Sequence, residues 1–435
     1  MATIIDPTDD LRYEVVQIKN YDNVPIHTTT DPGTGTKPTS LDAFGRQRVS
    51  APLTLFDSAH RFQDNQLWNT STVSGGTETF NANQGLIDLT VGTTSGALVY
   101  RETTKVFAYQ SGKSLLIMNT FVFNPAKANL RQRVGYFGTA NGMFLELDGA
   151  AGNVLTFVER TSISGSKVET KISQSSWSVD PMDGSGLSGL TLDITKAQIL
   201  WMDMEWLGTG TVRMGFVING KFILCHEFHH ANSISSTYIT TACLPLRYEI
   251  ENTGTTTSSS TLKQICSTVL SEGGYELRGT QQGLSTPITS PTFLAVAGTY
   301  YPILGLRLKT TRLDAIVILS ALSVFGISNN ANYNWQIITA GTMSGGTWTS
   351  AGTNSSVEYN MTGTSFTGGR ILAQGFLSAS NQASFPISIN KETLFKFQLE
   401  RNSFTSTPFE VALVVTGSVA NTSLYAAADF EEVTR

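Results

Sequence analysis

Two carboxylates and a tryptophan alternate with apolar residues in the stretch Leu200–Trp206. This period of two predicts a β-strand that carries Trp201, Asp203 and Glu205 on one face. Carboxylates two residues apart on a strand lie about 6–7 Å from each other, between the separations used by retaining and inverting glycosidases. A tryptophan beside them could stack on a sugar ring. We therefore take these three residues as a candidate glycan-binding site, and the carboxylate pair as a candidate for glycan hydrolysis.

A second candidate is the stretch His226–His230, which reads H-E-F-H-H and matches the zinc-protease pattern H-E-x-x-H. In that pattern two histidines one helical turn apart bind the same metal ion. Here the pattern follows the apolar run Phe222–Cys225, which predicts a strand, and histidines four apart on a strand are about 13–14 Å apart. We therefore predict no metal site. We expect a strand end and turn whose imidazoles make hydrogen bonds, with His226 on the apolar side.

The elements that carry these residues are three successive alternating runs within residues 198–230, which predict a β-meander. A two-residue loop at Asn219–Gly220 would leave both faces of the second hairpin mixed in polarity. A three-residue loop that also includes Ile218 would pair Phe216 with Phe222 and bury one clean apolar face. We predict this longer loop.

A similar turn, Gly208–Gly210, precedes the run that carries Arg213. A three-residue loop at this turn places Glu205 opposite Arg213. Opposite charges at facing positions stabilise an antiparallel pair, so we predict a cross-strand ion pair. Neutralising Glu205 in this way weighs against hydrolysis.

Composition favours a structural β protein. Charged residues make up 14% of the 435-residue chain, against about 25% in typical soluble domains. Gly, Thr, Ser and Asn take their place, which predicts a surface of hydroxyl and amide groups. The net charge of −5 offers no basic surface for nucleic acid. No Ser-His-Asp elbow, Walker loop or Rossmann fingerprint is present, so we predict no catalytic residue, cofactor or metal ligand.

The cysteines and the N-terminus bear on where the protein is made. The three cysteines stand at wide, unpatterned positions, Cys225, Cys243 and Cys266. We expect free, buried thiols formed in a reducing cytoplasm. The first residues lack the apolar core of a signal peptide, and no run approaches the roughly 18 apolar residues of a membrane helix. We therefore expect neither classical secretion nor membrane insertion.

The fold expected from the whole chain is all-β. Many short alternating runs recur at intervals of about 8–12 residues, with turn residues between them, which is typical of sandwiches and jelly rolls. Residues 1–40 are expected to form an extended N-terminal arm. Residues 41–280 are predicted to form a lectin-like, concanavalin-type β-sandwich, and residues 285–435 a second, smaller β-sandwich.

Two long motifs link the chain to a known family. Residues Asp42–Trp68 follow the pattern D-A-F-G-R-x-R-V-S-x-P-x-T-L-F-D-S-x-x-R-x-x-D-N-x-L-W, and the meander residues Trp201–Lys221 with Cys225–Asn232 form the second motif. Both resemble segments of virion structural proteins of tailed bacteriophages, notably marine phages and cyanophages. The resemblance covers roughly residues 41–280, and it implies a part of the virion rather than a particular chemistry.

The function expected from these observations is a non-enzymatic structural component of a tailed-phage virion, made in the host cytoplasm. By analogy with β-rich phage appendages, we expect a tail, baseplate or fibre protein that forms a homo-oligomer, namely a homotrimer. The arm, with Arg46, Arg48 and Arg61 behind it, is the expected contact with neighbouring virion proteins. The alternatives are a head-surface or neck decoration protein, a receptor-recognition protein that binds host glycan during attachment, and a polysaccharide depolymerase.

Overall fold

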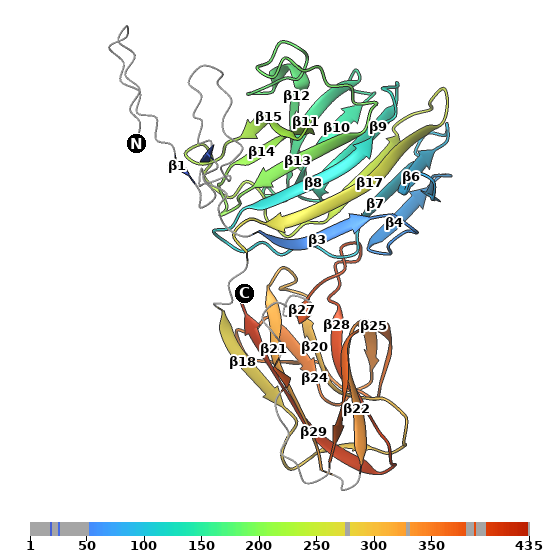
Figure 1. The fold of residues 1–435 in the computed structure, drawn as a ribbon, viewed down its shortest axis with the longest axis vertical. Coiled ribbons are helices and arrows are strands. Elements are labelled where there is room, and N and C mark those ends of the chain that lie inside the picture. Colours follow the sequence, from blue (N-terminus) through green and yellow to red (C-terminus); the bar gives the residue numbers. More distant parts are fainter. Residues whose placement is uncertain are drawn as a thin grey trace.

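The computed structural model describes residues 18–19, 25–26, 52–274, 279–327, 331–379, 387–388 and 397–433. Within these ranges the regular secondary structure consists of β-strands and the 3-10 turn η1 (Gln174–Ser176). This confirms the predicted all-β class. The strands form two sandwiches, which lie one above the other in Figure 1. None of the described helices is long and apolar enough to cross a membrane.

The first sandwich packs two antiparallel sheets face to face (Figure 1). As far as the structure describes the chain, the seven-stranded sheet contains, in spatial order, β12 (Val168–Ser173), β11 (Val154–Thr161), β10 (Gly142–Asp148), β9 (Leu130–Phe137), β16 (Leu246–Asn252), β7 (Leu98–Thr103) and β4 (Trp68–Val73). The eight-stranded sheet contains β15 (Lys221–Phe228), β14 (Val212–Ile218), β13 (Gln198–Met204), β8 (Leu115–Val122), β17 (Ser260–Ser271), β6 (Leu86–Val91), β5 (Thr77–Asn81) and, paired with β17, β3 (Leu53–Ala59).

The second sandwich also has two sheets, each six-stranded over the described residues. The first consists of β18 (Thr280–Ser285), β29 (Thr422–Glu432), β21 (Val317–Gly326), β26 (Ile387–Ser388), β19 (Thr292–Leu294) and β27 (Gln398–Leu399). The second consists, in order, of β23 (Thr349–Ser350), β24 (Val357–Asn360), β20 (Tyr301–Leu308), β28 (Glu410–Gly417), β22 (Asn332–Ser344) and β25 (Ser365–Ser378). A separate pair, β1 (Ile18–Lys19) with β2 (Pro25–Ile26), is the described part of the predicted arm; the rest of residues 1–40 lies outside the described residues.

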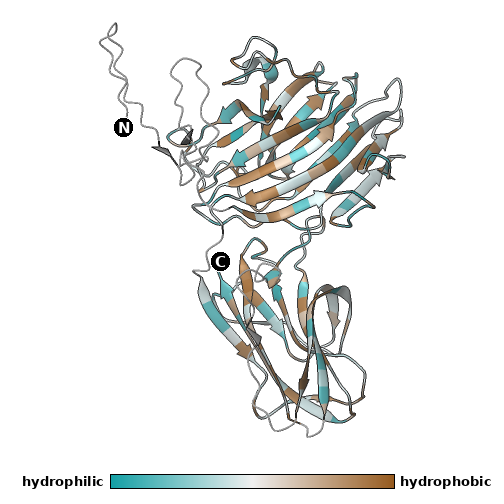
Figure 2. Ribbon diagram, viewed as in Figure 1, coloured by the Kyte–Doolittle hydropathy of each residue, from teal (hydrophilic) through white to brown (hydrophobic). Residues whose placement is uncertain are grey.

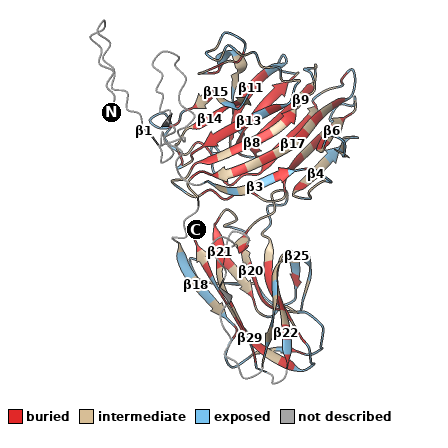
Figure 3. Ribbon diagram, viewed as in Figure 1, coloured by how far each residue is buried: buried red, intermediate tan, exposed pale blue. Residues whose placement is uncertain are grey.

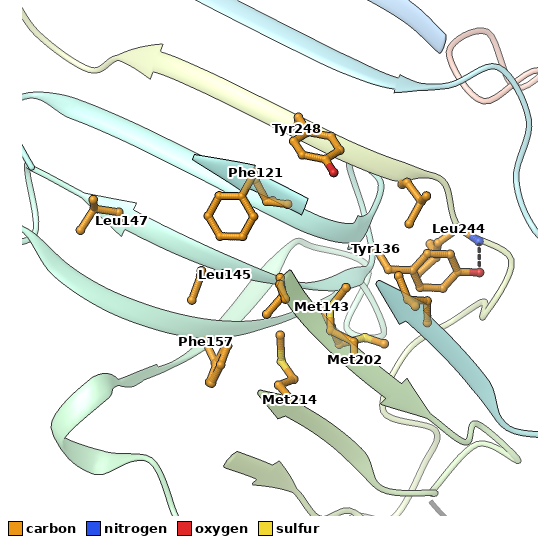
Figure 4. Close-up of a cluster of buried hydrophobic side chains, with 14 of the residues drawn as sticks. Phe121, Tyr136, Met143, Leu145, Leu147, Phe157, Met202, Met214, Leu244 and Tyr248 are labelled. Atoms are coloured by element: carbon orange, nitrogen blue, oxygen red, sulfur yellow. Dashed lines mark hydrogen bonds between the residues drawn. The ribbon is translucent and has the colours of Figure 1, made fainter. Parts of the chain in front are cut away.

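Alternation of apolar and polar residues explains why the strands stack. Strand β8 alternates buried and half-buried side chains along its whole length, and Figures 2 and 3 show the same alternation in hydropathy and burial on its neighbours. Between the sheets, large side chains such as Phe121, Phe157 and Tyr248 interdigitate (Figure 4). Burying each such side chain contributes roughly 1.5–3 kcal/mol to folding. The Tyr136 hydroxyl stays satisfied in this core because it accepts a hydrogen bond from the Leu244 N–H at 3.1 Å.

The meander forms as predicted, but the register of its second hairpin differs from the prediction. Ile218 pairs directly with Lys221, so the loop has only two residues, Asn219 and Gly220, both with positive φ. Such a turn has the twist that suits a hairpin. The mixed faces that this register creates are resolved by a β-bulge between Met214 and Gly215, which returns the strand to an apolar pairing. A bulge can change the register within one hairpin, so loop length alone does not decide it.

The first hairpin also differs from its prediction. Met204 pairs with Val212 and Asp203 with Arg213, so the loop between β13 and β14 is longer than three residues. The predicted register, with Glu205 opposite Arg213, is therefore wrong, because Arg213 faces Asp203 and forms an ion pair with it. The added length accommodates a tight turn in which Leu207 and Gly208 have positive φ and the Gly210 N–H donates to the Trp206 carbonyl.

A junction joins the two sandwiches along the loop between β27 and β28. Lys105, just beyond β7, forms an ion pair with Glu400 at 2.6 Å, and its backbone bridges to Asn402. The Ser403 N–H donates to the Thr104 carbonyl at 3.2 Å. The ring of Phe404 packs on Tyr100 with 5.3 Å between centroids. Polar and aromatic contacts thus hold the loop of the second sandwich against the first.

A second set of junction contacts surrounds Asp314. Its carboxylate accepts hydrogen bonds from the Arg401 Nε at 2.9 Å and from the Thr241 hydroxyl of the first sandwich. Arg401 also donates to the Cys243 carbonyl at 3.2 Å. Beside this network, apolar residues from both sandwiches form one cluster, with Ala108, Ile316 and Ile318 buried and Leu53, Leu55 and Val433 partly buried against them. The junction therefore combines ion pairs with a small apolar core, which favours a fixed orientation of the two sandwiches.

Candidate functional site

Trp201, Asp203 and Glu205 lie on β13 or directly after it, and they are not at the surface. Their exposed fractions are 0%, 0% and 3%. The Trp201 indole donates to the Ile223 carbonyl at 3.2 Å, and its ring meets Phe222 edge-on. A sugar ring has no exposed tryptophan face to stack on here, so the structure does not support the predicted glycan site.

Gly215 makes room for the buried indole. It pairs with Trp201 across β13 and β14, and a Cβ added to it would lie 3.0 Å from the indole nitrogen and 1.9 Å from the Ile223 carbonyl oxygen. Only glycine allows this close approach. The Trp201 indole therefore packs against the neighbouring strand of its own sheet and presents no ring face to a ligand.

The Asp203 carboxylate belongs to a local polar cluster. It accepts a hydrogen bond from the Ser114 hydroxyl at 2.6 Å and forms a buried ion pair with Arg213. These contacts satisfy a charge that would otherwise be costly to bury. A polymeric substrate cannot reach a carboxylate held in this way, and the geometry therefore does not support the predicted hydrolytic role of Asp203 and Glu205.

The predicted assembly residues are only partly described. Arg46 and Arg48 lie outside the described residues. Arg61 is exposed, and its guanidinium lies 5.0 Å from the ring centroid of Phe62, which is itself 82% exposed. Their role in docking to other virion proteins stays a prediction.

The H-E-x-x-H pattern lies on strand β15 and just beyond it, as the sequence predicts. His226 is buried opposite Met214, and its Nδ1 accepts a hydrogen bond from the Ser178 N–H at 3.1 Å. Burial lowers the pKa of His226 to about 4. In the described part of the chain, no group of three or more His, Cys, Asp or Glu residues could hold a metal ion.

His230 connects the two sheets of the first sandwich. Its Nε2 lies 2.8 Å from a carboxylate oxygen of Glu159 on β11, and its ring stacks on Tyr238 at 4.0 Å. Burial acts to lower the pKa of His230, but the hydrogen bond and charge of Glu159 and the Gly210 carbonyl outweigh it, so the pKa is raised. The protonated imidazole therefore holds the sheets together more strongly than the neutral one.

This pair predicts a pH dependence of stability. Because the folded-state pKa of His230 is raised, its contribution is complete below the unfolded value of about 6.5 and is lost as pH rises through the folded pKa. We expect the His230→Asn variant to lose roughly 1–2 kcal/mol of unfolding free energy at pH 6, and less at pH 8.5. Urea unfolding followed by tryptophan fluorescence measures both values. His229→Asn, at an exposed neighbouring ring, is the control; an equal loss at both pH values for His230→Asn would contradict the assignment.

The outward face of the seven-stranded sheet carries an extensive set of buried charges, which we call the charged lattice. Its members are Glu102, Arg133, Glu146, Arg160, Arg247 and Glu249, and all of them are buried. They occupy alternate positions on β7, β9, β10, β11 and β16, opposite to the residues that enter the core.

Arg133 is at the centre of the lattice because of strand register. It pairs with Glu146 on one neighbouring strand and with Glu249 on the other. The Arg133 Nε donates to Glu146 at 2.6 Å, and its Nη1 donates to Glu249 at 3.0 Å. Glu249 also accepts two hydrogen bonds from Arg247, at 2.6 and 3.0 Å. A guanidinium with several donors in one plane suits this two-sided arrangement.

Aromatic rings complete the lattice. Phe137 and Phe144 are fully buried on the same outward face, with 4.4 Å between ring centroids. The Arg160 guanidinium lies 4.8 Å from the Phe144 centroid, and that of Arg247 lies 3.8 Å from the Tyr100 centroid. These stacked cations cover the rings and replace the water that would otherwise meet them. The outcome is an outer sheet face closed by its own side chains.

The charged lattice was missed by sequence reasoning, although a signal was present. The charged residues Arg247, Glu249 and Glu251 alternate with the apolar residues Tyr248 and Ile250. Charges at every second position on several strands are the pattern that would have indicated a lattice. Which charges pair still depends on strand order.

Comparison with known proteins finds similar solved structures but no family. No protein-family model matches the sequence, and no curated protein matches it either. A Bacteroides ovatus GH16 protein from a mixed-linkage glucan locus, solved with a G4G4G3G product, is 9% identical with a TM-score of 0.34, over 49% of this chain and 99% of that one. The CBM2 module of the evolved Dit protein of Lactobacillus casei phage J-1 is 8% identical with a TM-score of 0.35, over 52% and 98%. Arcelin-5, a lectin-like defence protein of Phaseolus vulgaris, is 10% identical with a TM-score of 0.31, over 51% and 99%.

These similarities agree with the predicted lectin-like sandwich and correct one prediction. Three of the similar structures are described as glycosyl hydrolase family proteins. They contradict the prediction that the chain is not an enzyme. Enzymes and passive binding proteins share this fold, because chemistry depends on the site rather than on the sandwich. Composition and missing motifs were therefore not sufficient to exclude catalysis.

Proposed function

We propose that the protein is a structural component of a tailed-bacteriophage virion, made in the host cytoplasm and built into the tail, baseplate or fibre as a homo-oligomer. The proposal is supported by the resemblance of residues 42–68 and 201–232 to virion structural proteins. The second of these motifs includes the β13–β15 meander, whose tryptophan and carboxylates are buried structural residues. A motif whose residues stabilise the fold, and do not bind a ligand, is consistent with a scaffold that other virion proteins contact.

The observation that carries the proposal is the junction between the two sandwiches. Ion pairs from Lys105 and Arg401, the Tyr100–Phe404 ring contact and a shared apolar cluster bind one sandwich to the other. Contacts of this kind limit the relative motion of two domains, whereas domains on a free linker move independently. A fixed orientation is what a repeating part of a particle requires, since every copy must present the same surfaces.

The proposal is tested first on particles of the phage that encodes the chain. Mass spectrometry of gradient-purified particles should recover peptides from both sandwiches at a constant ratio to the other structural proteins. Peptides found only in the soluble fraction of the lysate would contradict the proposal.

The assembly state is tested on the purified protein by light scattering after gel filtration. We expect a homotrimer, with a mass of three 47.0 kDa chains, and a smaller species once residues 1–40 are removed. A monomer in both forms would contradict assembly through the arm. The alternative positions, at the head surface or neck, are distinguished by labelling the chain in particles and locating the label by electron microscopy.

A further inference from the structure

An uncharged group of side chains lies on the outward face of β22 and β25 in the second sandwich. We call it the amide–aromatic platform, and its members are Tyr300, Asn334, Gln336, Gln374 and Phe376. Phe376 is 82% exposed and Tyr300 is 42% exposed. Two exposed aromatic rings set among amide side chains on one sheet face offer a ligand an apolar surface beside hydrogen-bonding groups.

Strand alternation places the platform on one face. Tyr333 and Trp335 are buried in the core of the second sandwich, so Asn334 and Gln336, next to them on β22, face outward. In the register of the two strands, Asn334 pairs with Phe376 and Gln336 with Gln374. Facing residues in an antiparallel pair have their Cβ atoms about 5 Å apart, so the exposed ring and the amides are immediate neighbours.

Hydrogen bonds hold the platform in place. The Tyr300 hydroxyl donates to the Asn334 Oδ1 at 2.7 Å and accepts from the Gln336 Nε2 at 3.2 Å. The same Gln336 nitrogen lies 3.3 Å from the Gln374 Oε1, to which it donates. Among the described residues, neither the Gln336 Oε1 nor the Gln374 Nε2 has a hydrogen-bond partner. One acceptor and one donor therefore stand side by side next to the exposed ring.

The platform also has a rigid support. Beneath it, the Trp335 indole packs directly under Gly375, where an added Cβ would lie 2.7 Å from the indole ring. The Asn334 amide donates to the Gly375 carbonyl at 3.1 Å from the neighbouring strand. Side chains positioned in advance lose little conformational entropy when a ligand binds.

The chemistry of the platform selects its ligand. Its members carry no charge, so a charged ligand would find no partner there. A pyranose ring offers an apolar C–H face to an aromatic side chain, and its adjacent hydroxyl groups both donate and accept hydrogen bonds. We propose that the amide–aromatic platform is a binding site for a neutral saccharide, with Phe376 as the stacking ring and Gln336 and Gln374 as the hydroxyl contacts.

A second copy of the chain is a less suitable occupant. Strand β25 is at the sheet edge, but Gly368 and Gly369 have positive φ, and the register breaks between Ile337 and Ile338. Kinks and bulges of this kind interrupt the row of backbone groups that strand addition needs. The saccharide site goes beyond the proposed virion role and does not depend on it.

The test uses the full chain and a panel of neutral tetrasaccharides (cellotetraose, maltotetraose, mannotetraose and chitotetraose), with tetragalacturonic acid as the anionic comparison. Binding is measured by isothermal titration calorimetry. We expect at least one neutral probe to bind. We expect Phe376→Ala to weaken it about tenfold or more, and Gln374→Ala about fivefold or more, with Phe376→Trp restoring affinity. Phe293→Ala, at an exposed phenylalanine on the other sheet, is the matched control and should change affinity less than about twofold.

Each remaining outcome overturns the proposal. These outcomes are that no neutral probe binds, that Phe376→Ala binds as well as the parent chain, or that the anionic probe binds more tightly than any neutral one. If Phe376→Ala instead lowers the native mass and no saccharide binds, the platform is a subunit contact. Loss of saccharide binding with an unchanged native mass leaves the virion proposal intact, so the two proposals fail separately.

Discussion

Glu249→Leu is expected to lower the unfolding free energy by about 3–5 kcal/mol. Glu249 is buried and accepts hydrogen bonds from both Arg133 and Arg247. Leucine fills a similar volume but leaves both guanidiniums short of one negative partner in a site that water does not reach. Removing one member of a buried ion pair is costly for this reason, even where replacing the whole pair would not be. Urea unfolding at pH 7 measures the change.

Glu251→Leu is the matched control, on the same strand and face. Its partner Arg131 is at the rim of the sheet, and both side chains are about a quarter exposed. An ion pair in contact with solvent contributes about 1 kcal/mol or less. An equal loss of unfolding free energy in both variants would mean that burial does not increase the stabilisation from the ion pairs of the charged lattice.

The same residue predicts how stability responds to acid. Burial would raise the pKa of Glu249, but the charges of Arg247 and Arg133 outweigh it and lower the pKa to about 2. A lowered carboxylate pKa contributes stability that is complete above the unfolded value, near 4.5, and is lost as pH falls through the folded one. The parent chain should therefore lose roughly 3 kcal/mol from this group between pH 5 and pH 2. Glu249→Leu should show a correspondingly flatter decline over that range.

Trp201→Ala is expected to cost about 3–5 kcal/mol, the usual penalty for emptying a large buried site. The indole is fully buried against Phe222 and directly over Gly215, and it donates a hydrogen bond to the Ile223 carbonyl. Truncation would leave a cavity and remove the hydrogen bond from the indole to the Ile223 carbonyl. Thermal or urea unfolding measures the loss.

Phe62→Ala provides the control, because Phe62 is a large ring of the same sandwich that is 82% exposed. It should change stability by less than about 0.5 kcal/mol. The Trp201 experiment also separates the two interpretations of its strand. A glycan-binding tryptophan would lose sugar affinity with little loss of stability, and that result would contradict the buried role that the structure assigns.

The sequence predicted the strand that carries Trp201, Asp203 and Glu205, but it did not predict their burial. Alternation shows which residues share a face, and Asp203 and Trp201 do share one. It does not show whether that face meets solvent, because this depends on what packs above the sheet. The residue that faces Arg213 also differs from the prediction, since loop length must be known before facing residues can be named.

The sequence by itself determined the all-β class and the strand that carries the start of the H-E-x-x-H pattern, because both follow from periodicity between near neighbours. Which residues pair in the charged lattice depends on the tertiary structure. Arg133 and Glu249 are 116 residues apart in the chain and meet only because β9 and β16 are adjacent in the sheet. The amide–aromatic platform has the same origin, since Gln336 and Gln374 come together through the pairing of β22 and β25. Strand order is set by the packing of the whole core, so contacts that depend on it cannot be read from local pattern.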